Sequence, residues 1–178
     1  LLGLLQDEGV HAHQEHLFKI MRRARQTWPE GEIVIHPFLD GRDTPPRSTL
    51  EYLGRLEQEM ADVGNCRIGT VMGRYYAMDR SKDWALTDTA YRCLVNAEGR
   101  RAASAEDAVA ESYARDKTPD GVDMFDEYVP PYCIGDFAGI KDGDCVLHTN
   151  YRQDRAIQLS MAFVDPAYPG TLPAKPKV

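Results

Sequence analysis

Cysteine is scarce in this sequence, and its spacing fits neither a metal site nor a disulfide framework. Zinc sites and disulfide-rich secreted domains both need closer or denser cysteines. No C-x-x-C pair occurs among the 178 residues. We therefore expect reduced thiols, buried or half-buried, inside a reducing compartment. The thiols concerned are Cys66, Cys93, Cys133 and Cys145.

Long apolar runs and an excess of positive charge are also missing. No run approaches the roughly 20 residues of a membrane span, and there is no secretory signal pattern. With 28 acidic and 21 basic side chains, the formal charge is −7. A nucleic-acid-coating protein needs positive charge to displace counterions from phosphates. We expect a cytoplasmic protein with neither a membrane nor a nucleic-acid partner.

The familiar glycine-rich phosphate loops and the nucleophile elbow are absent. The sequence contains no G-x-x-x-x-G-K-[ST], no G-x-G-x-x-G and no G-x-S-x-G. The chain thus offers no obvious nucleophile of its own. Its content of 43% hydrophobic and 28% charged residues is that of an ordinary globular domain.

What is present is an alternation of short apolar segments with amphipathic ones. Strands are predicted at residues 1–5, 32–39, 65–72 and 144–149. Helices are predicted at residues 14–26, 48–60, 84–97, 105–113 and 153–163, the second opened by an S-x-x-E capping box at Ser48 and Glu51. Residues 118–143, rich in Pro, Gly and Asp, predict hairpins or long loops. This order predicts an α/β fold, a three-layer domain with a largely parallel or mixed sheet flanked by helices.

The domain is expected to span residues 1–164, followed by a proline-rich tail or linker over residues 165–178. The first five residues are Leu-Leu-Gly-Leu-Leu, without an initiator Met. We therefore expect the chain to be a piece of a longer protein.

Polar side chains gather in the loops that follow the predicted strands, at residues 6–13, 40–47, 73–80 and 150–155. Such loops meet at the carboxyl edge of a parallel sheet, where ligands bind. They contain His11, His13, Asp43 and the arginines Arg42, Arg47, Arg74, Arg80, Arg152 and Arg155. Arginine forks match phosphate and carboxylate oxygens, and the last two arginines open a predicted helix, which favours an anion. The sequence predicts a site for a small, highly charged anion. Other arginines are expected on helix surfaces or ends: Arg22, Arg23, Arg25, Arg100 and Arg101.

Two local patterns leave alternatives open. Asp43, between arginines, fits either a proton acceptor for a substrate hydroxyl or a structural residue that closes the loop through Asx-type bonds. The H-A-H-Q-E-H stretch at residues 11–16 resembles the metal-binding stretch of metallo-β-lactamase-type hydrolases, which would make His11, His13 and His16 metal ligands. We favour one histidine bonded to the anion, with the others capping or packing.

Four stretches resemble the cofactor-independent phosphoglycerate mutases, in the order and close to the spacing of that family. They are D-E-G-V-H-A-H at 7–13, F-L-D-G-R-D-T-P-P at 38–46, I-G-T-V-M-G-R-Y-Y-A-M-D-R at 68–80 and N-Y-R-Q-D-R-A at 150–156. The resemblance implies the inserted transferase domain, which holds the glycerate. It also implies an isomerase of glycolysis and gluconeogenesis that interconverts 3-phosphoglycerate and 2-phosphoglycerate.

By this resemblance, Asp43 is a catalytic proton shuttle. The substrate-binding residues are His11, Arg42, Asp43, Arg74, Arg80, Arg152 and Arg155. The implied reaction passes the phosphoryl group to a serine of a covalently linked phosphatase-like domain. That domain would bind two divalent metal ions, usually manganese, whereas this chain would bind no metal or cofactor and would be inactive alone.

The first motif departs from the usual S-D-G-G-V-H-S-H of the family at Gln6, Glu8 and Ala12. Glu8 adds negative charge beside an anion site, and Ala12 removes a hydroxyl. We therefore expect these departures to weaken or alter the affinity for the anion. These departures motivate one alternative, a non-catalytic module that binds phosphoglycerate or a related anion. A second, less favoured alternative is a metallohydrolase built on the histidine cluster.

Overall fold

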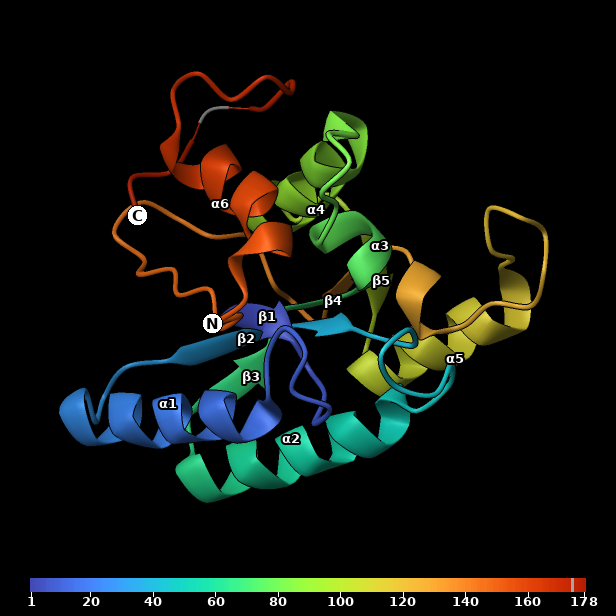
Figure 1. Ribbon diagram of the computed structural model, residues 1–178. Helices are drawn as coiled ribbons and strands as arrows, with labels where there is room; N and C mark the ends of the chain where they lie inside the picture. Colours follow the sequence, from blue (N-terminus) through green and yellow to red (C-terminus); the bar gives the residue numbers. More distant parts are fainter. Residues whose placement is uncertain (174) are drawn as a thin grey trace.

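Six short strands form one mixed sheet in a computed structural model that describes residues 1–173 and 175–178 (Figure 1). The strands are β1 (Leu2–Leu4), β2 (Ile33–Leu39), β3 (Cys66–Ile68), β4 (Thr70–Gly73), β5 (Arg100–Ala102) and β6 (Tyr132–Ile134). Their order is β1-β2-β4-β6-β5, with β3 also paired to β2. β1, β3 and β4 run parallel to β2, while β6 is antiparallel to β4 and parallel to β5. Of the two sheet types predicted, the mixed one is present.

The predicted strand at 65–72 is confirmed, but it is interrupted by a bulge at Gly69. Ile35 pairs with Ile68, and Phe38 pairs with Met72. Three steps along β2 therefore match four along its partner, which is the signature of one inserted residue. A Cβ on Gly69 would lie 2.7 Å from a side-chain atom of His36 and equally close to Val34. Glycine is thus required where the strand bends.

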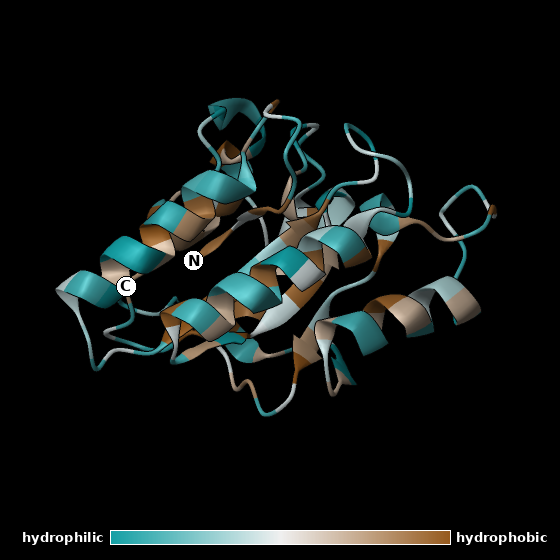
Figure 2. Ribbon diagram, turned by 90° about the horizontal axis from the view of Figure 1, so that it is seen from below, coloured by the Kyte–Doolittle hydropathy of each residue, from teal (hydrophilic) through white to brown (hydrophobic). Residues whose placement is uncertain are grey.

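Helices cover both faces of the sheet, which confirms the three-layer architecture (Figure 1). They are α1 (Gln14–Thr27), α2 (Thr49–Val63), α3 (Arg74–Ala77), α4 (Trp84–Asn96), α5 (Ala105–Arg115) and α6 (Ile157–Val164), with 3-10 turns η1 (Asp126–Tyr128) and η2 (Gln153–Arg155). One apolar layer contains residues of α1, α2 and α5, and the other contains residues of α3, α4 and α6. Figure 2 shows hydrophilic residues along the outer sides of the helices.

β2 supplies both layers because successive side chains of a strand point to opposite faces. Ile35 and Leu39 are buried with α1 and α2, while Phe38 is buried with α4 and α6. No helix in the described part of the chain has the length and apolar character needed to cross a membrane.

Residues 144–149 do not form the predicted strand. Only His148 bridges to Leu2, flanked by hydrogen bonds from Leu2 N to Leu147 O and from Thr149 N to Leu2 O. The next donor, Leu4 N, is taken by the side-chain oxygen of Asn150 at 2.9 Å, so the ladder ends after one step.

Four further predictions are corrected. β6 and η1 lie within the stretch predicted as loops or hairpins, and Arg100 and Arg101 belong to β5 instead of a helix surface or end. The predicted helix at 153–163 begins as η2 and becomes α-helical only at Ile157. Cys145 is exposed because it lies in an irregular segment, whereas Cys93 and Cys133 are buried and Cys66 is half-buried.

The capping box predicted at the start of α2 is also wrong. The Ser48 hydroxyl donates to Pro45 O, and the helix N-terminus is capped by Asp126 from η1. Asp126 Oδ2 accepts from Ser48 N at 3.0 Å and from Thr49 N at 2.9 Å, and its other oxygen accepts from the Tyr113 hydroxyl. This single buried carboxylate joins η1, α2 and α5.

Residues 165–173 are irregular, and Tyr168 and Thr171 among them contact α4. Tyr168 is buried against Trp84, with ring centroids 5.3 Å apart, and its hydroxyl donates to Asp88. Thr171 N donates to the same carboxylate at 2.7 Å. The predicted boundary between a domain over residues 1–164 and a tail or linker over residues 165–178 stays a prediction.

Candidate functional site

The loops after the parallel strands converge at one edge of the sheet, as their order predicts. Arg152 N donates to His11 O at 3.2 Å, which joins the last loop to the first. His11 Nε2 lies 3.9 Å from Asp43 Oδ2, and Arg74 Nη1 lies 2.6 Å from the same oxygen. Because His11, Asp43 and Arg74 follow β1, β2 and β4, their meeting depends on the parallel pairing of these strands. The loop of Arg152 follows the irregular segment 144–149.

The centre of the site is a buried arginine held by two aspartates. Arg74 has 2% of its surface exposed, and Nη1 donates to Asp40 Oδ1 and to Asp43 Oδ2, both at 2.6 Å. Asp40 Oδ1 also accepts from the backbone N–H groups of Arg42 and Asp43. The sequence offered Asp43 as an alternative candidate for closing this loop, whereas Asp40 has that role. Asp40 was not singled out, although its D-G-R-D setting after a strand is the signal for an Asx turn.

Asp43 is left as an ionised carboxylate facing the cluster. Burial alone would raise its pKa, but the hydrogen bond and charge of Arg74, with smaller contributions from His11 and Arg155, lower the pKa below the ordinary 3.8. At neutral pH its oxygens are therefore free to accept a proton or a hydrogen bond from a ligand hydroxyl.

His11 lies between two carboxylates without a hydrogen bond to either. It is 3% exposed, with Nε2 3.9 Å from Asp43 and Nδ1 3.6 Å from Asp154. Burial, followed by the charges of Arg74 and Arg152, lowers the pKa of His11, against the opposing effect of the two aspartates. The imidazole is therefore neutral near pH 7 and offers one donor and one acceptor.

Arg80 and Arg152 share a second carboxylate that sequence reasoning did not single out, that of Asp154. Arg80 Nη1 donates to Asp154 Oδ2 at 2.6 Å, and Arg152 Nε lies 2.9 Å from Oδ1. Burial raises the pKa of Asp154, but the hydrogen bond from Arg80 and the charge of Arg152 outweigh it and lower the pKa below 3.8. The group is an anion at neutral pH.

Arg155 and Arg42 complete the cluster. Arg155 Nη1 donates to Met78 O at 3.0 Å, and burial together with the charges of Arg74, Arg80 and Arg42 lowers its pKa. Arg42 is mostly exposed and lies 3.3 Å from Glu127 of η1. Like charges facing one another make this a region of positive potential that an anion would relieve.

Three residues named with the loops lie outside this arrangement. Arg47 donates to Met124 O and stacks 4.7 Å from the Tyr113 ring centroid, so it holds the fold together. His13 Nδ1 accepts from Glu15 N at the start of α1, and His16 packs 5.6 Å from Tyr151. Among residues 1–173 and 175–178, no group of three or more His, Cys, Asp or Glu side chains is placed to hold a metal ion. The histidine geometry does not support a metallohydrolase.

In the described part of the chain, the side chains of the three departures in the first loop make no hydrogen bond or ion pair with the clustered arginines. Gln6 is buried and its side-chain oxygen accepts from Gly9 N at 3.1 Å. Glu8 is exposed to solvent, and Ala12 is buried in the apolar layer beside α4. Their effect on ligand affinity stays a prediction.

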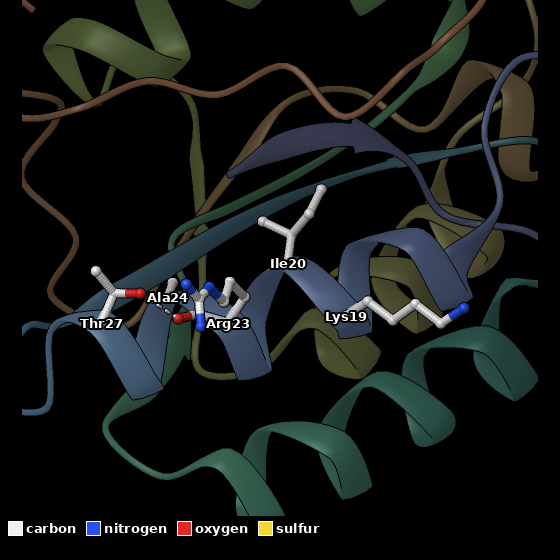
Figure 3. Close-up of a pocket in the computed structure, with 5 residues that line it drawn as sticks. All are labelled: Lys19, Ile20, Arg23, Ala24 and Thr27. Atoms are coloured by element: carbon white, nitrogen blue, oxygen red, sulfur yellow. Dashed lines mark hydrogen bonds between the residues drawn. The ribbon is translucent and has the colours of Figure 1, made fainter.

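The outer side of α1 has a shallow hollow of about 440 Å³, and it shares no residue with the arginine cluster (Figure 3). Its lining is formed by Lys19, Ile20, Arg23, Ala24 and Thr27. Thr27 donates to Arg23 O, a local helix contact. This hollow has two basic side chains and no carboxylate or imidazole, so it lacks the combination of groups that surrounds Arg74.

Comparison with known proteins gives consistent results for nearly the whole chain. Residues 1–177 match a family model described as BPG-independent PGAM N-terminus (iPGM_N). A 2,3-bisphosphoglycerate-independent phosphoglycerate mutase of Chromobacterium violaceum is 44% identical over 99% of this chain and 34% of its own length. The Moorella thermoacetica protein of the same name is 45% identical over 93% of this chain and 31% of its own length.

A solved structure has the same fold. It is a Leishmania mexicana phosphoglycerate mutase, crystallised at low cobalt concentration, with a TM-score of 0.88 and 30% identity. The alignment covers 99% of this chain and 33% of the Leishmania protein. The chain therefore spans about a third of the length of the relatives it matches.

Proposed function

This chain belongs to the family of 2,3-bisphosphoglycerate-independent phosphoglycerate mutases and corresponds to their N-terminal domain, and on this basis we propose that its arginine cluster binds 2-phosphoglycerate and 3-phosphoglycerate. The observation that carries the proposal is the meeting of the post-strand loops around Arg74, with a neutral imidazole and an ionised Asp43 beside it. Each ligand has a phosphate and a carboxylate, and arginine forks bind both groups.

In the proposed reaction, this domain binds the glycerate and a second, phosphatase-like domain transfers the phosphoryl group. A serine of the second domain would take the phosphoryl group and return it to the other hydroxyl of the glycerate. The arginines here would hold the glycerate while it reorients, which keeps the step intramolecular. Two divalent metal ions, expected to be manganese in the second domain, would supply charge for phosphoryl transfer.

Asp43 is proposed to hold the proton of the reacting hydroxyl. Its carboxylate is ionised at neutral pH, so a ligand hydroxyl bound beside it could donate its proton to Asp43, whose Oδ2 lies 3.9 Å from His11 Nε2. Arg74 fixes the carboxylate through its 2.6 Å hydrogen bond. Because the acceptor serine would belong to the second domain, we expect no mutase turnover from this chain alone in a coupled assay.

A calorimetric titration of the 178-residue chain with 3-phosphoglycerate, in chelator and at low salt, tests the binding proposal. We expect binding that weakens with salt, because salt screens the arginine charges. Arg152→Ala should weaken it at least about tenfold, which is the loss of one charge-assisted contact. Arg115→Ala is the matched control, since Arg115 is exposed on α5 and pairs with Glu111 of the same helix. Equal affinities for the parent and Arg152→Ala would contradict the proposal.

A further inference from the structure

Asp154 lies inside the proposed anion site although it carries the same charge as the ligand. Its oxygens lie 2.6 Å from Arg80 Nη1 and 2.9 Å from Arg152 Nε. A phosphate or carboxylate that binds these arginines from the same side would compete with Asp154 for these N–H groups. A ligand anion beside an unmoved Asp154 would also be repelled by it.

Asp154 differs from Asp40 in what holds it. Asp40 is buried and accepts two backbone N–H groups, so it belongs to the loop structure. In the described part of the chain, Asp154 accepts hydrogen bonds only from the side chains of Arg80 and Arg152. Its side chain is 32% exposed, on the short 3-10 turn η2. It can therefore rotate toward solvent without leaving a backbone donor or the apolar core unsatisfied.

The imidazole beside Asp154 is also incompletely bonded. His11 is buried, and its Nδ1 has no hydrogen-bond partner in residues 1–173 and 175–178. Asp154 Oδ1 lies 3.6 Å from it, beyond hydrogen-bond distance. An acceptor at this position that sat slightly deeper would satisfy it.

We propose that Asp154 is an internal anion that occupies the ligand position on Arg80 and Arg152 and that a ligand displaces on binding. This inference rests on the proposed function, because it takes the arginine cluster as the phosphoglycerate site. Its consequence is selectivity. A dianionic phosphate competes with one carboxylate for the two arginines, whereas a singly charged anion gains little by the exchange.

The test is the substitution Asp154→Asn, which keeps the size of the side chain and removes its charge. The parent chain and the variant are titrated calorimetrically with 3-phosphoglycerate and separately with inorganic phosphate. Asp136→Asn is the control, since it changes net charge equally, while Asp136 is 97% exposed and pairs with Arg67 away from the cluster. We expect Asp154→Asn to tighten both ligands about tenfold, and Asp136→Asn to leave both within about twofold.

The outcomes separate this inference from the proposed function. If the parent binds 3-phosphoglycerate and Asp154→Asn binds it equally or more weakly, Asp154 positions the arginines instead of competing for them, and only this inference fails. If Asp154→Asn and Asp136→Asn tighten binding equally, the effect comes from net charge alone, and this inference also fails. If no protein binds either anion, the arginine cluster is not an anion site and both proposals fail.

Discussion

Replacing Arg74 with methionine should destabilise the domain far more than replacing an exposed arginine such as Arg115. Arg74 is 2% exposed and donates to two carboxylates, of which Asp40 is also buried. Arg74→Met keeps an apolar side chain in the space but leaves Asp40 without its cation. Breaking a buried ion pair from one side costs about 3–5 kcal/mol. Asp40 keeps two backbone N–H donors, so we expect the lower end, about 3 kcal/mol.

For a chain of this size, each kcal/mol moves the thermal midpoint by roughly 2–4 °C. Circular dichroism should therefore show Arg74→Met melting roughly 6–12 °C below the parent. Arg115→Met is the control, because Arg115 is 74% exposed and its i,i+4 pair with Glu111 is worth only about 0.5 kcal/mol. A double variant, Arg74→Met with Asp40→Asn, should regain part of the loss, since Asn keeps the backbone acceptor and removes the unpaired charge.

A midpoint for Arg74→Met within about 2 °C of the parent would contradict the expected cost of the unpaired carboxylate. It would mean that water reaches Asp40 or that the aspartate is protonated without cost. A double variant that melts below Arg74→Met would contradict the second step, because the charge of Asp40 would then stabilise the fold without its arginine.

The burial of titratable groups and the geometry of the first loop lead to three more predictions. Burial holds the pKa of His36 well below 6.5 and lowers that of His148 to about 4, so the unfolded chain binds more protons and stability falls as pH drops below 6.5. Urea unfolding should show up to about 1.4 kcal/mol lost per pH unit for each histidine. The pKa of Asp126, raised by burial to about 6, reduces this loss below pH 6, and a flat profile from pH 7.5 to 5.5 would contradict the assignment. Asp126→Ala should lower the free energy of unfolding by about 2–4 kcal/mol, because α2 loses its cap and the Tyr113 hydroxyl loses its acceptor. Asp126→Asn should lower it less. Equal urea midpoints for the parent and Asp126→Ala would show that water replaces the carboxylate. Glu8→Gly combined with Ala12→Ser should change the phosphoglycerate affinity less than about twofold in calorimetry, since Glu8 faces solvent, and a tenfold gain would show that the departures weaken the site.

The parts of the fold that the sequence predicted are those with a local signal, such as apolar periodicity or a helix-ending residue. The strand at 32–39 and α1 follow from apolar periodicity, and the proline after Trp28 marks the helix end. The meeting of the loops follows from the order of strands and helices. β5 and β6 were missed because each has three residues, too few for a periodic signal. Their pairing is decided by tertiary contacts.

The parts of the site that the sequence did not yield are the carboxylates of Asp40 and Asp154. Asp40 and Asp154 sit one or two residues from arginines in the chain, but their partners Arg74 and Arg80 come from another loop. Asp126 caps a helix that begins 77 residues earlier. Such roles depend on distances across the fold, which spacing along the chain does not encode.

Because β6 runs antiparallel to β4, the loops that follow these two strands lie at opposite edges of the sheet. The loops after β5 and β6 leave the sheet opposite the arginine cluster, beside a hollow of about 320 Å³ that includes Ser104 and Gly135. A protein engineer can therefore attach a fluorophore or a tether at that far end without altering the electrostatics of the binding edge.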